Sequence, residues 1–268
     1  MTANPPPEKK KKPVTGRTRS VVVGIDKAIL WFADHWLGAF NVIVAIYVGL
    51  PVLAPVLMQA GVTGPAKTIY VAYSPLCHQM ATRSFFLFGE QVAYPRAEAE
   101  FAALDTFEEY AVNAPEFADI DLTNDNWEQV FLRARSFLGN DEMGYKTALC
   151  QRDLGIYFFI LVFGLVYALL RPRFKVRALP LWAFIIFGMG PIGLDGFSQL
   201  FGYFGLLDGP LGAILGLFPV RESTPILRSL TGAWFGFCLA WLAYPNIEPG
   251  MKETVADLTA KLTRAGEL

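Results

Sequence analysis

The sequence predicts an all-α protein: a polytopic bundle of about four transmembrane helices, with an outer-leaflet helix and a small helical cap outside the membrane. The chain of 268 residues is 53% hydrophobic and only 18% charged, whereas soluble domains have about 25% charged residues. Four uncharged runs approach the length of about 20 residues that a helix needs to cross a bilayer. This composition excludes an ordinary soluble enzyme and a disordered protein, and we expect no nucleic-acid partner.

The four uncharged runs define the predicted spans. They are Leu37–Ala60, Leu154–Leu170, Ala178–Leu194 and Ser229–Ile247. Two of them contain only 17 residues, so the charged residues on either side must lie close to the membrane interface.

Lysines and arginines in short flanking segments predict the orientation of these spans. Seven basic residues lie within residues 1–27, and four lie in the turn Arg171–Arg177. The segment Gly89–Lys146 instead holds 13 acidic residues against 4 basic ones. We therefore expect a multi-pass protein of the cell membrane with both termini in the cytoplasm and the 92–146 cap on the extracytoplasmic side.

The segments before the cap follow from composition and charge. Residues 1–20 are rich in proline and lysine, which predicts a disordered basic tail near anionic lipid. Residues 21–36 mix apolar and charged side chains, as in an interfacial helix that leads into the first span. Residues 37–91 hold the first span and then a helix, Thr68–Gly89, that dips into the outer leaflet, because a fifth crossing would contradict the predicted orientation.

The remaining segments are predicted to be helical. In the acidic cap, residues 92–146, apolar residues recur at helical spacing over Trp127–Leu138, and a weaker helix covers Arg96–Ala111. Residues 147–247 form a core of three spans, and residues 248–268 form a cytoplasmic amphipathic helix. The lipid bilayer is the expected partner. The cap or the C-terminal helix offers a surface for other membrane-protein subunits, unless its apolar face packs on the protein itself.

Polar residues gather at the predicted outer ends of the spans. The candidate ligand-binding residues are His78, Gln79, Arg83, Arg152, Asp153, Asp195, Gln199, Arg228 and Thr231. Four separate segments contribute them at one level of one leaflet. Ionisable groups near a bilayer are costly, so this convergence indicates a functional site.

The same residues form four motifs that resemble a known family. The motifs read PLCHQ at Pro75–Gln79 with RSFF at Arg83–Phe86, CxRDxGIY at Cys150–Tyr157, DGxxQ at Asp195–Gln199 and RxxTG at Arg228–Gly232. In this order they resemble a family of small prokaryotic integral membrane proteins that is classed as a domain of unknown function. The resemblance implies a membrane location and a set of residues, but no activity.

The chain departs from the family pattern at two places. About 55 residues, the acidic cap, separate the first two motifs, which the family usually joins by a short connection. The second motif often reads CxRC, whereas Asp153 stands at its last position here. This difference removes one candidate thiolate ligand.

Two interpretations of the cluster use its cysteines. A zinc site would take Cys77, His78 and Cys150, with Asp153 or Asp195 as a fourth ligand, because mixed sets of this kind suit zinc. Adjacent helical side chains point about 100° apart, however, which makes Cys77 and His78 an awkward pair. A disulfide between Cys77 and Cys150 is the second interpretation, since the outer side of the membrane is oxidising.

Two further interpretations use the charged residues. Arg83, Arg152 and Arg228 are suited to an anionic group such as a lipid phosphate or a carboxylate. In an enzyme, His78 with one of the aspartates would supply acid–base chemistry. In a purely structural network, the two later arginines would instead pair with Asp153 and Asp195 and bind no ligand.

Two classes of function follow from these interpretations. We favour a non-catalytic accessory or structural subunit of a membrane assembly. The alternative is a small membrane enzyme or binding protein that acts on a lipid or another anionic amphiphile, with zinc as its candidate metal.

Overall fold

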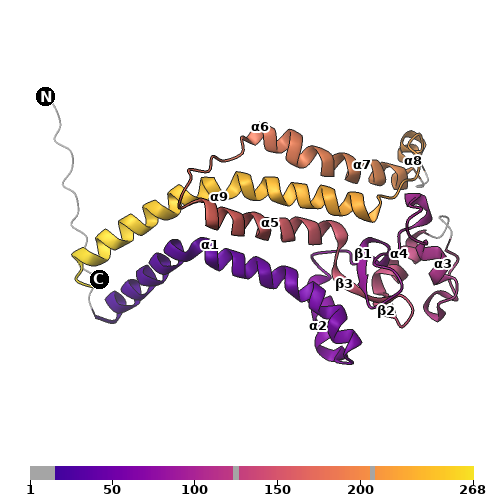
Figure 1. Ribbon diagram of the computed structural model, residues 1–268, viewed down its shortest axis with the longest axis horizontal. Helices are drawn as coiled ribbons and strands as arrows, with labels where there is room; N and C mark the ends of the chain where they lie inside the picture. Colours follow the sequence, from indigo (N-terminus) through magenta and orange to yellow (C-terminus); the bar gives the residue numbers. More distant parts are fainter. Residues whose placement is uncertain (1–15, 123–126, 206–208) are drawn as a thin grey trace. The chain divides into compact units, whose positions relative to one another are not determined.

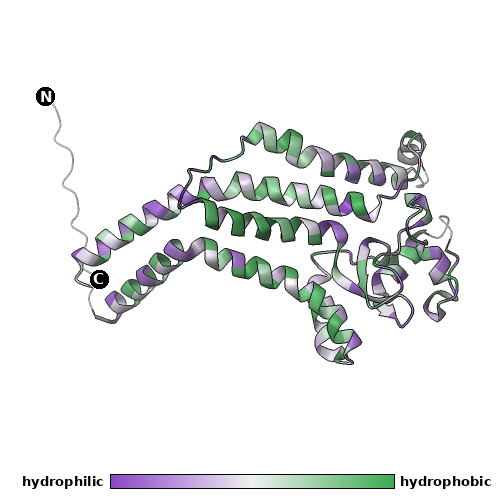
Figure 2. Ribbon diagram, viewed as in Figure 1, coloured by the Kyte–Doolittle hydropathy of each residue, from purple (hydrophilic) through white to green (hydrophobic). Residues whose placement is uncertain are grey.

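The computed structural model describes residues 16–122, 127–205 and 209–268. Within them, four helical segments are long and apolar enough to cross a membrane: α1 (Gly16–Gln59), α5 (Gln151–Leu170), Leu181–Phe204 and α9 (Pro225–Arg264). The predicted polytopic helical bundle with about four spans is therefore confirmed (Figure 1). Figure 2 shows hydrophobic residues along most of α5, which give way to hydrophilic residues at its N-terminal end.

The third span is a composite helix. It consists of α6 (Leu181–Ala183), a π-helical turn over Phe184–Met189 and α7 (Gly190–Phe204). The uncharged run ends at Leu194, but the helix continues to Phe204. Asp195 and Gln199 therefore lie inside α7, whereas the hydropathy had placed them beyond the end of the third span.

Glycines bring α5 and α9 into close contact. A Cβ atom added at Gly232 would lie 2.3 Å from the carbonyl oxygen of Arg152, and one at Gly236 would lie 2.1 Å from that of Ile156. Only glycine leaves room for two backbones at this distance, which is a common device of helix packing in membranes. The contact at Gly232 places the N-terminal turns of both helices next to each other.

Aromatic residues connect α1 to its neighbours. The Tyr47 ring packs edge-on against Tyr157 of α5, with ring centroids 4.5 Å apart. The carbonyl oxygen of Tyr47 accepts a hydrogen bond of 2.8 Å from the hydroxyl of Tyr73, the last residue of α2 (Thr63–Tyr73). These contacts fix the segment that precedes the PLCHQ motif against the bundle.

The chain between α2 and α5 forms a small domain with its own hydrophobic core. Its elements are η1 (Ala81–Arg83), β1 (Ser84–Leu87), η2 (Ala97–Ala99), α3 (Phe107–Ala111), η3 (Pro115–Phe117), α4 (Trp127–Ser136), β2 (Gly139–Asn140) and β3 (Gly144–Cys150). The three strands form an antiparallel sheet in the order β1-β3-β2, in which Ser84 lies opposite Cys150. Side chains from 81 to 143 fill the core, among them Phe86, Tyr94, Phe107, Phe117 and Phe137.

The sequence did not predict this sheet, and two predicted helices are wrong. The helix expected over Thr68–Gly89 ends at Tyr73, because Pro75 follows at once and the residues from Ser84 to Leu87 alternate between buried and half-buried, as in a strand. The segment Arg96–Ala111 contains only η2 and α3, since Glu100 between them has a left-handed backbone with φ of 48°.

Two features of the cap region also bear on the prediction. α4 confirms the helix predicted over Trp127–Leu138, and its residues Val130 and Ala134 are buried in the domain itself. The strand β3 runs across the predicted boundary between the cap and the three-span core at residue 146. The domain therefore includes the first motif and the start of the second, both of which sequence reasoning had assigned to the membrane.

The described residues of 1–39 and Asn246–Leu268 form a second compact unit. Here Lys261 pairs with Asp26 at 2.6 Å and Arg19 pairs with Glu267 at 3.2 Å. The predicted interfacial helix 21–36 and amphipathic helix 248–268 are thus continuations of α1 and α9 that pair with each other. Of the predicted basic tail, residues 16–20 begin α1, and residues 1–15 lie outside the described residues.

Candidate functional site

Five residues of the predicted cluster come together, three of them at the ends of elements and two from the middle of α7. Arg152 is in the first turn of α5, Arg228 is in the first turn of α9, and Arg83 ends η1. Asp195 and Gln199 lie one turn apart in α7, and both are buried. The glycine contacts between α5 and α9 explain why the first two arginines lie so close together.

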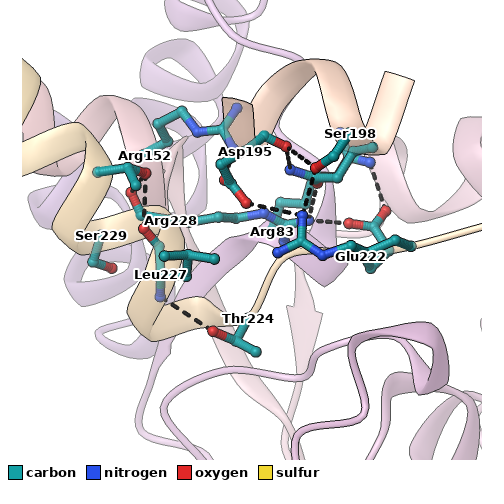
Figure 3. A network of polar contacts seen from close by, with 12 residues as sticks. Arg83, Arg152, Asp195, Ser198, Glu222, Thr224, Leu227, Arg228 and Ser229 are labelled. Atoms are coloured by element: carbon teal, nitrogen blue, oxygen red, sulfur yellow. Dashed lines mark hydrogen bonds and ion pairs between the residues drawn. The ribbon is translucent and has the colours of Figure 1, made fainter. Parts of the chain in front are cut away.

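Glu222 is the centre of one half of the resulting network. Its carboxylate accepts a hydrogen bond of 2.5 Å from Arg83, one of 2.9 Å from the hydroxyl of Tyr203 and one from Arg228. The guanidinium of Arg228 also donates to the Gln199 side chain at 3.0 Å. Figure 3 shows Arg83 and Arg228 converging on this carboxylate.

Asp195 is the centre of the other half. Its carboxylate binds Arg152 through one oxygen and Arg221 through the other, the latter at 3.3 Å. Arg221 also donates to the Ser198 hydroxyl at 2.6 Å. Each buried carboxylate is therefore held by two arginines, which is the kind of compensation that a buried charge needs.

The arginines also control the charge of Glu222. Burial by itself would raise the pKa of this carboxyl, because the charged form loses its hydration. The positive charges of Arg83 and Arg228 outweigh burial and lower the pKa of Glu222 to about 2. The carboxylate is thus ionised at neutral pH, and both ion pairs are intact.

A cavity of about 300 Å³ lies beside the network. Polar residues form part of its wall, namely Arg83, Arg96, Arg152, Thr82, Gln199 and Tyr203. The other lining residues are mainly apolar, namely Met80, Val130, Phe131, Ala134, Gly196, Leu200 and Phe204. Ligand pockets span about 300–1,000 Å³, so this cavity suits a small ligand or part of a larger one.

Three residues that line the cavity each have a buried polar atom with no hydrogen-bond partner among the described residues. These atoms are Nε of Arg83, Nε of Arg152 and Oγ1 of Thr82. Buried polar groups in folded proteins are nearly always satisfied, and an unsatisfied one costs about 1–3 kcal/mol. A ligand or water that reached these atoms would complete their hydrogen bonding.

Arginines and carboxylates pair around the cavity. Among the ion pairs of the described residues are those of Arg83, Arg96, Arg152, Arg221 and Arg228 with Glu98, Glu108, Asp195 and Glu222. The arginines that line the cavity, Arg83, Arg96 and Arg152, favour an anionic ligand over a cationic one.

Gln79 and Thr231 belong to the predicted cluster but do not join the network. The amide of Gln79 donates to the backbone oxygens of Tyr70 and Ala148, at 2.8 and 3.0 Å, and so links α2 to β3. The hydroxyl of Thr231 donates to Leu227 one turn earlier in its own helix, at 2.7 Å. Both residues have structural contacts in place of the predicted ligand contacts.

His78 and Asp153 also lie apart from the network. His78 is exposed and its ring faces Phe131, with centroids 6.0 Å apart. Asp153 accepts a hydrogen bond of 3.2 Å from the Cys150 thiol. Of the two acids expected to pair with Arg152 and Arg228, Asp195 binds Arg152, whereas Arg228 pairs with Glu222 and not with an aspartate.

The cysteines form a separate cluster. One ligand atom each of Cys77, Cys150 and Asp153 lies within 4.8 Å of the others, and His78 is not part of this group. Both thiols are free in this structure, so the predicted disulfide is not formed here and stays a prediction. A metal site at the cysteines stays a prediction. The group contains Asp153, which the sequence had named as a possible fourth ligand, but not His78.

Sequence reasoning missed several residues of the network. Arg221 and Glu222 lie in a short segment between α8 (Pro210–Leu215) and α9, and Arg96 lies in the cap. The adjacent charges at 221 and 222 directly follow an apolar stretch. That charged pair is the signal in the sequence that could have indicated a buried partner for the arginines.

Comparison with known proteins agrees with this architecture. Residues 132–242 match the model of a family described as "Predicted membrane protein (DUF2085)". The uncharacterised protein MJ1492 of Methanocaldococcus jannaschii is 23% identical over 177 residues, which are 66% of this chain and 67% of the archaeal one. No solved structure matches. The resemblance to an uncharacterised family of integral membrane proteins is therefore confirmed, through residues 132–242 and through this archaeal relative.

Proposed function

We propose that this protein is a membrane-embedded binding protein whose cavity takes the anionic head group of an amphiphile, a phosphate or a carboxylate on an apolar chain. The observation that carries this proposal is the lining of the cavity, where Arg83, Arg96 and Arg152 lie beside an apolar wall. A purely structural ion-pair network requires neither a cavity nor unsatisfied donors.

The hydrogen-bonding state of the arginines supports an anion. Arg83 and Arg152 each bind a carboxylate through a terminal nitrogen, and each keeps a buried Nε without a partner. The oxygens of a phosphate or carboxylate accept such bonds strongly, because both partners are charged. The unsatisfied hydroxyl of Thr82 adds a further donor.

The apolar wall supports an attached chain. Phe131 of α4 and Leu200 and Phe204 of α7 line the cavity. Apolar area removed from water contributes roughly 25 cal/mol per Å², so a methylene chain against this wall adds affinity that a free anion lacks. About 300 Å³ accommodates a head group and the start of a chain, but not a whole lipid.

This proposal chooses the binding-protein alternative over the accessory subunit, which stays a prediction. His78 and Asp153, the expected acid–base pair, are not among the residues that line the cavity. The proposal therefore includes no reaction. The charge distribution of the sequence predicts that the cavity faces the extracytoplasmic side.

Native mass spectrometry of the full chain, extracted in mild detergent, tests the proposal. We expect an adduct of a few hundred daltons that is released on denaturation. The protein stripped of this adduct should bind monododecyl phosphate or dodecanoate more tightly than inorganic phosphate and more tightly than the uncharged dodecyl maltoside. The two anionic probes then distinguish a phosphate head group from a carboxylate.

A pair of double variants gives the matched control. Arg152→Gln with Asp195→Asn removes one cavity arginine together with its carboxylate, and the other partner of Asp195, Arg221, has a side chain that is 38% exposed to water. Binding of the anionic probe should weaken about 10-fold or more, because hydrogen bonds to charged groups contribute about 1.5–3 kcal/mol. Arg133→Gln with Asp119→Asn removes an exposed pair and should leave binding unchanged. Equal affinity of both double variants, or no preference for anionic probes, would contradict the proposal.

A further inference from the structure

The geometry points to a binding site for a thiophilic metal ion such as Zn²⁺, formed by Cys77, Cys150 and Asp153. This site is separate from the cavity, whose lining includes none of the three residues. The inference goes beyond the proposed amphiphile binding and does not depend on it.

Three different elements bring the ligand atoms together. Cys77 lies in the turn after α2, Cys150 ends β3, and Asp153 is in the first turn of α5. The backbone N–H of Cys150 donates to the Cys77 sulfur at 3.3 Å. The two amide bonds of Gln79 to Tyr70 and Ala148 support the same junction, so the turn that carries Cys77 is held against the end of the strand.

The spacing of the three atoms suits a metal ion. The ligand atoms all lie within 4.8 Å of one another, and the sulfur of Cys150 is 3.2 Å from a carboxylate oxygen of Asp153. Around a tetrahedral zinc ion with Zn–S of about 2.3 Å and Zn–O of about 2.1 Å, ligand atoms lie roughly 3.5–3.8 Å apart. Small side-chain rotations would therefore close the three atoms around an ion. Binding would release both thiol protons to solvent, because thiolates are the ligands.

The position of the ligands in the fold favours negative charge. Cys150 is the N-cap residue of α5, a helix of 20 residues, and Asp153 is in its first turn. The N-terminus of a helix carries a partial positive charge, which stabilises thiolates and carboxylates there. Two soft thiolates with one carboxylate select zinc-like ions over calcium or magnesium, which prefer oxygen ligands.

Asp153 resolves the difficulty that the sequence raised for a metal site. A set containing Cys77 and His78 requires two neighbouring side chains to point at one ion, whereas the observed set takes each ligand from a different element. Three protein ligands leave a fourth tetrahedral position, which water would fill, as in zinc sites of the open type.

Cobalt substitution of the full-length protein in detergent tests the site directly. The protein, reduced and treated with a chelator, should bind one Co²⁺ and develop a thiolate-to-cobalt charge-transfer band, and one equivalent of Zn²⁺ should abolish that band. Cys77→Ser, Cys150→Ser and Asp153→Asn should each weaken metal binding by about 100-fold or more. Residues that only hold metal ligands in place already cost about 10- to 100-fold when they are mutated, and a ligand itself should cost more. Cys238→Ser and His78→Ala, which lie outside the cluster, should leave it unchanged.

A measurement on the unaltered protein remains decisive if a variant fails to fold. Zn²⁺ should slow alkylation of Cys77 and Cys150, mapped by mass spectrometry, but not that of Cys238, which is buried outside the cluster. Absence of the charge-transfer band, or alkylation indifferent to Zn²⁺, would overturn the inference. The purified protein could also contain a disulfide between Cys77 and Cys150. If the protein then binds no metal after this disulfide is reduced, the inference is overturned as well.

Discussion

The ion pairs around Glu222 and those of the terminal unit use the same kinds of side chain, but their environments differ. The side chains of Glu222 and Arg228 are 2% and 4% exposed, whereas those of Arg19 and Lys261 are 52% and 55% exposed. In water, the attraction between charges is screened and competes with side-chain entropy, so exposed pairs contribute about 0–1 kcal/mol. Burial removes that screening and also makes an unpaired charge very costly.

This difference indicates which ion pairs the stability of the fold depends on and which contribute little to it. The buried pairs at Glu222 and Asp195 connect η1, α5, α7 and α9, so losing one partner leaves a charge with no water to replace it. The pairs at Glu267 and Asp26 connect the ends of α1 and α9, and their basic partners are exposed to water although the Asp26 side chain is only 12% exposed. Four variants measure the contrast.

The largest effect is expected for Arg228→Met. The change leaves the buried Glu222 carboxylate short of one of its two arginines, and breaking a buried pair in this way costs about 3–5 kcal/mol. Thermal unfolding of the purified protein in detergent measures the loss. Arg228→Met combined with Glu222→Gln should recover much of it, and a single variant as stable as the parent would show that the buried pair is dispensable.

A smaller effect is expected from acid. The pKa of Glu222 is about 2 in the folded protein against an ordinary value of 4.5, so its contribution is present above pH 4.5 and is lost as the pH falls towards 2. The shift corresponds to about 3 kcal/mol. Unfolding free energies between pH 5 and pH 2.5 should fall less steeply for Glu222→Gln than for the parent. Parallel curves would rule out Glu222 as a source of acid sensitivity.

Lys146 sharpens the comparison, because it is a buried charge without an acidic partner among the bonds described. Its side chain is 0% exposed, and its ammonium donates to the backbone oxygens of Gln79 and Arg135, at 2.5 and 2.7 Å. Burial lowers the pKa of Lys146 to about 7 from an ordinary value of 10.5. Between these values the unfolded chain binds the extra proton, so stability rises with pH.

The gain from Lys146 should be about 2 kcal/mol between pH 7 and pH 9. Unfolding measured over this range should show the parent gaining stability relative to Lys146→Met, which has no proton to lose at this position. A difference between the two proteins that does not change with pH would show that the ammonium stays charged in the fold.

The smallest effect is expected for Lys261→Ala, which removes the exposed partner of Asp26. We expect a loss below about 1 kcal/mol, and salt at 1 M should remove most of it, because the Debye length is then only about 3 Å. Unfolding at low and high salt measures both. A loss as large as that of Arg228→Met would remove the distinction between the two groups of ion pairs.

The sequence predicted which segments cross the membrane and which arginines approach one another, but only some of their partners. Arg152 and Arg228 were found because charged residues at the ends of apolar runs are conspicuous. Asp195 was expected among their acids and binds Arg152, whereas Asp153, the other expected acid, accepts a hydrogen bond from the Cys150 thiol. Glu222 was missed because it lies in a short connection with no regular pattern.

The region around the first motif also contains features that the sequence alone does not predict. Hydropathy suggested one membrane-dipping helix over Thr68–Gly89, although Pro75 marks a break. The residues after it pair with β3, whose sequence follows the acidic cap. Strand pairing depends on a partner 60 residues away, so short strands such as β1, with Ser84 opposite Cys150 and Phe86 opposite Lys146, leave little trace in a single sequence.

The sequence by itself determined the four spans and the placement of polar residues at their ends, because the cost of burying charge in lipid acts on each local stretch of chain. Only the tertiary structure decided that Glu222 holds two arginines, that Asp153 replaces His78 beside the thiols, and that a cavity lies next to Arg83. These features depend on distances of a few ångströms between side chains from separate elements. The packing of the whole chain sets such distances.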